Sequence, residues 1–254
     1  MKPEQIDIIY NEECISGMTR LPDKSIDMIL CDLPYGITHN DWDTPLNYEH
    51  LWQQYHRVAK DNAAIVLFAQ CPFDKILALS NLKELKYEWI WAKEQGRGFL
   101  NAHCRPLNAH ETILVFSRGK ASPSAEPENR MPYFPQYDVG QPYVAVRGSE
   151  SNNYGRQRST TTINEGIRYP TSILKFNSDK GNVHPTQKPV KLLEYLILTY
   201  TQQGDIVLDN CMGSGSTAIA CLNTHRHFIG YELTEKYYKL ALRRIKDRQP
   251  KLML

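Results

Sequence analysis

The sequence has no apolar run long enough to span a bilayer, which excludes a transmembrane helix. Its first residues, MKPEQIDIIYNEE, lack the apolar core of a signal peptide, so we expect a protein that is not secreted. None of the six cysteines stands in a C-x-x-C pair, so neither a disulfide framework nor a zinc knuckle is indicated. We therefore expect reduced thiols in a cytoplasmic protein.

The sequence also lacks a strong excess of charge of one sign. Its 30 Lys and Arg against 28 Asp and Glu give a net charge of +2, so any basic surface for a nucleic acid must be local. His103, His110 and His184 show no metal-ligand spacing, and we predict no metal site. The 254 residues, 41% hydrophobic and 23% charged, are typical of one large globular α/β domain or of one domain with an insert.

Strand and helix patterns alternate through residues 1–117. Strands are predicted at 6–12, 25–32, 63–70, 87–94 and 111–118, and helices at 48–59 and 73–83. This alternation predicts a mostly parallel sheet with helices on both faces. The patterns resume near residue 171, with a helix in 183–201, a strand, glycine loop and helix in 205–224, and a strand, turn and helix in 226–248.

Residues 118–170 have a different character. They are rich in Pro, Gly, Ser, Asn, Tyr and Arg and show little periodicity, so we predict no regular sheet element there. So long an irregular segment inside a compact domain is usually functional or disordered. The chain thus divides into 1–117, 118–170 and 171–254, two halves of one α/β domain with an insert between them.

A glycine loop follows the strand that ends at Asp209. Gly213 and Gly215 permit a tight turn and a close approach of a ligand to the backbone, and the helix that follows favours negative charge at its start. Glu232, at the end of the next strand, suits the two hydroxyls of a ribose. The loop lacks the Gly-Lys-Ser/Thr of a P-loop, which disfavours a triphosphate. A mononucleoside site is indicated, and a plain turn without a ligand is the alternative.

The stretch DLPYG lies where a predicted buried strand ends in an acid, with a proline and an aromatic residue directly after it. Asp32 offers two carboxylate oxygens to an amino group, and Pro34 stiffens the turn, so that the Leu33 carbonyl becomes a second acceptor. Tyr35 adds a flat face for stacking. These groups suit the amino group of a planar base. The alternative is a turn that merely ends the strand, with Asp32 as its cap.

Taken together, these motifs resemble those of a known family. DLPYG resembles the D-P-P-Y motif of the amino-group DNA methyltransferases, and VLDNCMGSGST resembles their S-adenosylmethionine loop, D-P-F-x-G-S-G-T. HPTQKPVKLLEYLI matches the segment before that loop nearly letter for letter, and residues 91–119 are similar to the middle strands of the family. The order, with the catalytic motif first and the cofactor loop last, is that of the β class. The similarity covers nearly the whole chain.

The resemblance implies a Rossmann-like, mostly parallel, doubly wound sheet that is circularly permuted, with an irregular target-recognition insert. Carried over residue by residue, the catalytic motif comprises Asp32, Leu33, Pro34 and Tyr35. The implied cofactor residues are Asp209, Gly213, Gly215, Ser216, Thr217, Glu232, Thr186 and Lys188, the last two closing over the methionine end.

The sequence departs from the family pattern at two places. Leu33 replaces the first proline of the catalytic motif, which keeps the backbone carbonyl but makes the turn less rigid. Asn210 and Cys211 replace a proline and a phenylalanine in the cofactor loop, so we expect different packing around the cofactor.

The implied reaction is transfer of a methyl group from S-adenosylmethionine to the N6 of an adenine that is flipped out of the duplex and stacked on Tyr35. An aspartate at the first motif position favours adenine, and N4 of cytosine is the alternative. A nucleotide-dependent oxidoreductase on the same fold would leave Asp32, Tyr35 and HPTQKP unexplained. A non-catalytic DNA-binding homologue, damaged at Leu33, is the third candidate.

The family places target recognition in the insert, where arginines alternate with tyrosines. Contacts with double-stranded DNA are expected from Arg118, Arg130, Arg147, Arg156, Arg158 and Arg168. Members of the β class often dimerise, so a homodimer is expected. The chain has no nuclease motif, which leaves any restriction endonuclease to a separate chain. Trp42 and Asp43, downstream of DLPYG, resemble a W-D pair that is common among phage-borne members of the family.

Overall fold

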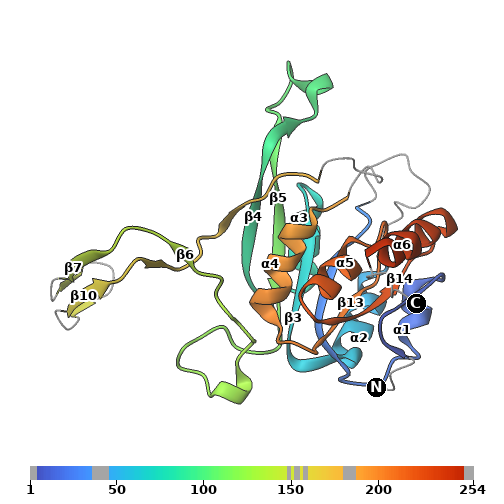
Figure 1. The fold of residues 1–254 in the computed structure, drawn as a ribbon, viewed down its shortest axis with the longest axis horizontal. Helices are drawn as coiled ribbons and strands as arrows, with labels where there is room; N and C mark the ends of the chain where they lie inside the picture. Colours follow the sequence, from blue (N-terminus) through green and yellow to red (C-terminus); the bar gives the residue numbers. More distant parts are fainter. Residues whose placement is uncertain are drawn as a thin grey trace, which may run out of the picture. The chain divides into compact units, whose positions relative to one another are not determined.

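The computed structural model describes residues 5–35, 46–147, 150–151, 155–156, 160–179 and 187–248 (Figure 1). The chain divides into two compact units. The large unit comprises Met1–Phe134 and Ser172–Leu254, and the small unit comprises Pro135–Thr171. The chain therefore leaves the large unit once and returns to it.

An eight-stranded sheet forms the centre of the large unit. Its strands, in spatial order, are β1 (Ile8–Tyr10), β14 (His227–Tyr231), β13 (Ile206–Asp209), β2 (Ile26–Asp32), β3 (Ala59–Ala69), β5 (Asn108–Phe116), β4 (Leu85–Arg97) and β12 (Ile173–Lys175). All neighbours from β1 to β3 are parallel, as are β4 and β12, whereas β5 runs antiparallel to both β3 and β4. The mostly parallel sheet predicted from the sequence is confirmed.

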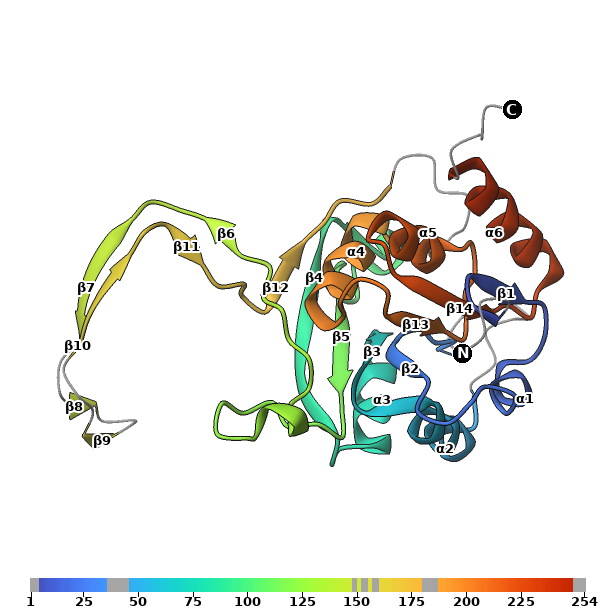
Figure 2. The same cartoon turned by 60° about the horizontal axis from the view of Figure 1, so that its bottom comes forward.

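Helices cover both faces of this sheet (Figure 2). One face carries α1 (Cys14–Met18), α2 (Tyr48–Val58) and α3 (Phe73–Ser80), and the other carries α4 (Val190–Tyr200), α5 (Ser216–Asn223) and α6 (Glu235–Arg248). Successive residues of a strand point to opposite faces, so Met28 and Leu30 of β2 pack with α4, while Ile29 and Cys31 pack with α2. A continuous apolar run is what a strand buried on both sides requires.

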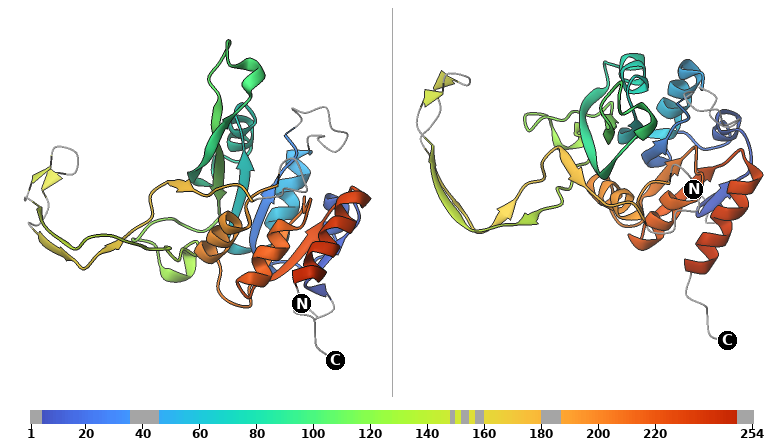
Figure 3. Two further views of the ribbon diagram at one scale, coloured as in Figure 1. Left: turned by 45° about the horizontal axis from the view of Figure 1, so that its top comes forward. Right: turned by 90° about the horizontal axis from the view of Figure 1, so that it is seen from above.

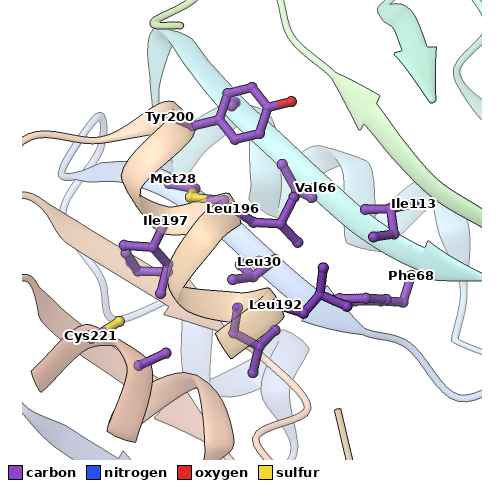
Figure 4. Close-up of a cluster of buried hydrophobic side chains, with 14 of the residues drawn as sticks. Met28, Leu30, Val66, Phe68, Ile113, Leu192, Leu196, Ile197, Tyr200 and Cys221 are labelled. Atoms are coloured by element: carbon purple, nitrogen blue, oxygen red, sulfur yellow. The ribbon is translucent and has the colours of Figure 1, made fainter. Parts of the chain in front are cut away.

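The close-up of the α4 face shows why that helix sits where it does. Leu192, Leu196 and Ile197 lie at helical spacing on one side of α4 and point at Leu30 and its neighbours on the strands (Figure 4). The predicted helix in 183–201 is confirmed at Val190–Tyr200.

The hairpin of β4 and β5 runs past the ends of the neighbouring strands (Figure 3). β3 ends its pairing with β5 at Ala69 and Thr112, whereas β4 and β5 continue to Arg97 and Asn108. The short 3-10 helix η2 (Phe99–Asn101) follows β4. Strand β12 was not predicted, because only Leu174 of its three residues is buried and so short a segment shows no hydrophobic periodicity.

The small unit contains antiparallel ladders, which corrects the prediction that residues 118–170 hold no regular sheet element. Its paired strands are β6 (Asp138–Val139) with β11 (Ile167–Arg168), β7 (Tyr143–Arg147) with β10 (Thr160–Asn164), and β8 (Glu150–Ser151) with β9 (Gly155–Arg156). Val144, Val146 and Ile163 are exposed, so these strands bury no face that would reveal them as a hydrophobic pattern.

Residues 118–134 belong to the large unit rather than to the small one. Met131 is buried in the core beside α4, and the short helix η3 (Pro127–Asn129) lies just before it. Lys120 and Arg130 form a β-bridge that closes this segment into a loop. The small unit thus begins at Pro135, whereas the sequence suggested an insert from residue 118.

Candidate active site

Three acids gather at one edge of the sheet because their strands are parallel neighbours. Asp32 ends β2, Asp209 ends β13, and Glu232 directly follows β14. β13 lies between the other two strands, pairing Leu208 with Ile29 of β2 on one side and Asp209 with Gly230 of β14 on the other. The pairing of β2 with β13 brings the two halves of the sequence together. Ligands of open α/β sheets bind at this carboxyl edge.

Two side chains hold the carboxylate of Asp32, whose side chain is 25% exposed. The Tyr35 hydroxyl donates to Oδ1 at 2.8 Å, and the Lys188 ammonium donates to Oδ2. The Tyr35 ring stacks on Phe73 at the start of α3, with 4.6 Å between ring centroids. Leu33 is buried among the apolar residues of the α1–α3 face, which explains how a leucine is accommodated in the motif.

Lys188 connects Asp32 to two residues that the sequence did not single out. Its Nζ lies 3.3 Å from Glu111 Oε2 in β5, and Glu111 Oε1 accepts from Lys93 Nζ in β4 at 2.5 Å. Acid and base therefore alternate along a largely buried row of four side chains, Asp32, Lys188, Glu111 and Lys93. The sequence holds one signal for this row, which is Glu111 directly before the buried run TILVF. A charged residue is unusual at the start of an ordinary core strand.

Burial and charge act against each other in this row. Burial raises the pKa of Asp32, opposed by the Lys188 ammonium and the Tyr35 hydroxyl, while the nearby Glu111 adds to the rise. At Glu111 burial also acts to raise the pKa, but Lys188 and Lys93 outweigh it and hold the pKa below its usual value. Burial would lower the pKa of Lys188, yet the two carboxylates raise it. Lys188 is thus a stable ammonium between two acids.

The segment that carries Lys188 is anchored next to the glycine loop. Asp179 Oδ2 accepts from the Val190 backbone N–H at 3.1 Å, at the start of α4, and from the Gln187 side chain at 3.3 Å. The Ser214 hydroxyl lies 3.5 Å from Gln187 Oε1. Residues 187–189 therefore join the end of β2 to the loop after β13.

Backbone groups hold the other two acids. Glu232 accepts from the Gly213 N–H at 2.7 Å and from the Thr234 N–H at 2.8 Å, and Asp209 accepts from the Cys211 N–H at 3.1 Å. Burial raises the pKa of Asp209 to about 6, although the Thr217 hydroxyl and the Cys211 N–H oppose it. Burial also raises the pKa of Glu232, against its two backbone donors.

The glycine loop needs its glycines for two different reasons. Gly213 and Gly215 have φ angles of +55° and +81°, in the left-handed region that side chains disfavour. A Cβ on Gly215 would also lie 2.9 Å from Ala241 Cβ in α6. Ser216 and Thr217 are buried in the first turn of α5, and Arg244 reaches the Ser216 hydroxyl at 3.2 Å.

Asn210 and Cys211 take part in a buried polar network instead of presenting a proline and an aromatic ring. The Tyr55 hydroxyl of α2 donates to Asn210 Oδ1 at 2.6 Å, and the Asn210 amide lies 3.5 Å from Cys14 Sγ and 3.6 Å from Cys211 Sγ. The amide thus fixes the loop to α1 and α2.

The arginines predicted to contact DNA have local partners where their side chains are described. Arg118 donates to the Ala59 carbonyl at 3.0 Å, and Arg130 to the carbonyls of Ala125 and Pro123 at 2.6 and 2.7 Å.

In the small unit, Arg168 donates to Asn164 Oδ1 at 2.5 Å and lies over the Tyr143 ring. Only the backbones of Arg147 and Arg156 are described, in β7 and β9. Arg158 and Thr186 lie outside the described residues, as do His184, Trp42 and Asp43.

Within the described residues, no cluster of three or more His, Cys, Asp or Glu side chains could hold a metal ion. No helix among them has the length and apolarity needed to cross a membrane.

A family model for DNA methylases of the N6/N4 type matches residues 26–243. Among curated proteins, the type II methyltransferase M.BglII of Bacillus subtilis is 27% identical, over 94% of this chain and 68% of its own length. M2.MboI of Moraxella bovis is also 27% identical, with 96% and 89% covered. M.HindIII of Haemophilus influenzae is 26% identical, with 94% and 95% covered.

Solved structures share the fold. M1.HpyAVI in complex with SAM matches with a TM-score of 0.59 and 24% identity, over 93% of this chain and 98% of that chain. The cytosine-N4-specific PvuII DNA methyltransferase matches with a TM-score of 0.63 and 14% identity, over 94% and 90%. At these identities the likeness concerns the architecture of the sheet and its helices.

Proposed function

Since the chain belongs to the family of N6/N4 DNA methylases, we propose that it methylates the exocyclic N6 of adenine within a specific sequence of double-stranded DNA. The general activity is that of the family, an S-adenosylmethionine-dependent transfer of a methyl group to an amino group of a DNA base. The proposal adds the base and the sequence specificity. The observation that carries it is Asp32, placed at the carboxyl edge beside the strand of the glycine loop.

The residues after β13 and β14 fit S-adenosylmethionine. Each oxygen of the Glu232 carboxylate binds one backbone N–H and has a further lone pair for a ribose hydroxyl. Among the described residues, a Cβ on Gly213 would meet no atom nearer than the Cys211 carbonyl oxygen at 3.9 Å, which supports a ligand in front of the loop. We propose that Asp209, Gly213, Gly215, Ser216, Thr217 and Glu232 hold the cofactor, which supplies a methyl group on a sulfonium.

The residues after β2 serve the base. Asp32 and the Leu33 carbonyl accept hydrogen bonds from the two amino hydrogens, which turns the nitrogen lone pair away from the ring and toward the cofactor side. Asp32 also stabilises the positive charge that develops on the nitrogen and holds the proton that leaves it. We propose that the flipped base stacks on the Tyr35 ring, which is backed by Phe73.

An aspartate at the head of the motif supports adenine as the base, and N4 of cytosine is the other candidate. Methylation of adenine N6 and methylation of cytosine N4 use the same methyl donor and require the same orientation of an exocyclic amino group. A cytosine-N4-specific enzyme also has the same fold. A DNA-binding homologue without activity is the third candidate, which the polar contacts of Asp32 and Glu232 speak against.

The test is to express the chain in a host that lacks DNA methylation and to map modified bases by single-molecule sequencing. We expect N6-methyladenine in one short sequence context, and none from the Asp32→Ala variant. N4-methylcytosine would keep the mechanism and overturn the base. No modification by soluble protein that still binds S-adenosylmethionine would overturn the proposal for the chain alone, and would point to a non-catalytic homologue or to a missing partner subunit.

Several further properties are part of the proposal. The relatives are named type II methyltransferases, and for this chain we propose double-stranded DNA as the substrate, a separate restriction endonuclease and a place in the cytoplasm. We propose a homodimer in solution, which light scattering tests directly. DNA contacts are proposed for the small unit through Arg147, Arg156, Arg158 and Arg168, where the arginines alternate with tyrosines.

A further inference from the structure

Lys188 occupies a position that the substrate needs. Its ammonium is bound to Asp32 Oδ2 while the Tyr35 hydroxyl is bound to Oδ1, so both oxygens already have a donor. A carboxylate oxygen can accept two hydrogen bonds, but an ammonium draws the negative charge toward itself and leaves a weak acceptor for a neutral amino group. With its side chain 8% exposed, Lys188 is not free to leave into solvent.

A second acceptor for Lys188 lies within reach. Glu111 Oε2 is buried and has no hydrogen-bond partner among the described residues, although it lies 3.3 Å from the Lys188 ammonium. The other oxygen of Glu111 is held by Lys93. An unmade hydrogen bond on a buried carboxylate is unfavourable, so this oxygen is ready to receive the donor that Asp32 releases.

We propose that Lys188 is a movable placeholder, which neutralises Asp32 in the free enzyme and shifts to Glu111 when the amino group of the target base arrives. This inference rests on the proposed function of Asp32. Lys188 and Glu111 are then positioning residues, since they act on the base through Asp32. The sequence suggested instead that Lys188 closes over the cofactor.

Electrostatics permit such a shift. The row of Asp32, Lys188, Glu111 and Lys93 contains two carboxylates and two ammonium groups, so a move within it leaves the buried net charge unchanged. The flexible four-carbon stem of a lysine allows a small swing between two acceptors. The Phe68 ring lies 5.0 Å from the Lys188 ammonium and offers a favourable aromatic face beside it.

The first test is Glu111→Gln, which keeps the shape of the side chain but removes the charge that attracts Lys188. The readout is fluorescence of a DNA duplex that carries 2-aminopurine beside the target base found by sequencing, so that the target keeps its amino group and its departure from the stack is reported by its neighbour. We expect less flipped base at saturating enzyme and a slower single turnover, by about 10- to 100-fold, the effect of losing a hydrogen bond to a charged group. The affinity for S-adenosylmethionine is expected to stay unchanged.

The second test is rescue by Lys188→Met in the Glu111→Gln background. This double variant removes one charge of each sign, and it frees Asp32 from the placeholder. We expect flipping to recover beyond the level of Glu111→Gln alone, whereas a purely structural ion pair would give equal or greater damage. Lys191→Met is the matched control, because that lysine is three residues further on and its side chain is 77% exposed.

Two results would overturn the placeholder. One is flipping and turnover by Glu111→Gln at the wild-type level. The other is a loss confined to S-adenosylmethionine affinity, which would assign Lys188 to the cofactor. In both, the wild-type enzyme still methylates DNA and the proposed function stands. A wild-type protein that modifies no base would refute the proposed function, and the placeholder with it.

Discussion

Asp32 and Glu232 share one edge of the sheet, yet groups of different kinds hold their carboxylates. Side chains hold Asp32, through the Tyr35 hydroxyl and the Lys188 ammonium. Backbone N–H groups of Gly213 and Thr234 hold Glu232. A backbone donor in a tight loop is fixed before a ligand arrives, whereas a side chain can exchange partners. In the proposed site, the cofactor side at Glu232 is therefore preformed, and the base side at Asp32 is the one that the placeholder proposal expects to rearrange.

The largest effect that separates the two sides is expected from Asp32→Asn. The amide keeps the size of the side chain but replaces an acceptor by a donor that faces the amino group of the base. We expect single-turnover methylation to fall by about 10²- to 10³-fold, the usual loss when one preorganised polar group of a transition state is removed. Calorimetric titration should give an unchanged affinity for S-adenosylmethionine.

Asp23→Asn is the matched control, since that acid forms an exposed ion pair with Arg57 away from the edge. Equal losses of cofactor affinity and turnover in Asp32→Asn would contradict the division into two sides.

The contacts of the two acids differ in how far they could be read from the sequence. Asp209 ends a short buried strand and accepts from the Cys211 N–H two residues on, and Glu232 directly follows another strand and accepts from the nearby Thr234 N–H, so both acids stand in local patterns. The row that contains Asp32 joins three strands and one loop, and the contact of Glu111 with Lys93 is decided by how β4 and β5 align. No local pattern contains that register.

The same limit applies to the rest of the molecule. Asn210 accepts a hydrogen bond from Tyr55, which is far away in the sequence. The sequence shows that Asn210 departs from the family pattern, but it does not predict this contact. The ladders of the small unit escaped because exposed strands give no burial pattern.

The next effect concerns the stability of the preformed side. Burial raises the pKa of Asp209 from its ordinary 3.8 to about 6, so the folded state binds this proton more tightly than the unfolded chain. The free energy of unfolding therefore falls as the pH rises through this window, by up to about 3 kcal/mol from this one group.

Asp209→Asn, which cannot ionise, should remove that loss. Urea unfolding on either side of the window should show a variant that gains stability relative to the wild type as the pH rises. The difference between the two proteins reports on Asp209 together with its charge interaction with Asp32, because Asp32 and Glu232 titrate in both. A constant difference across the window would mean that the carboxyl of Asp209 keeps its ordinary pKa.

The smallest effect is expected from Glu232→Gln. An amide oxygen can serve only one of the two backbone donors, so the other loses its acceptor and the ribose loses part of its site. We expect the dissociation constant of S-adenosylmethionine to rise by about fivefold, with base flipping unchanged, since one hydrogen bond contributes about 1 kcal/mol. Combining this change with Asp32→Asn sharpens the comparison. If fixed backbone groups shape one side and side chains the other, the two losses should add in free energy. Strong coupling between them would mean that the cofactor helps to build the base side, and that the edge works as one unit.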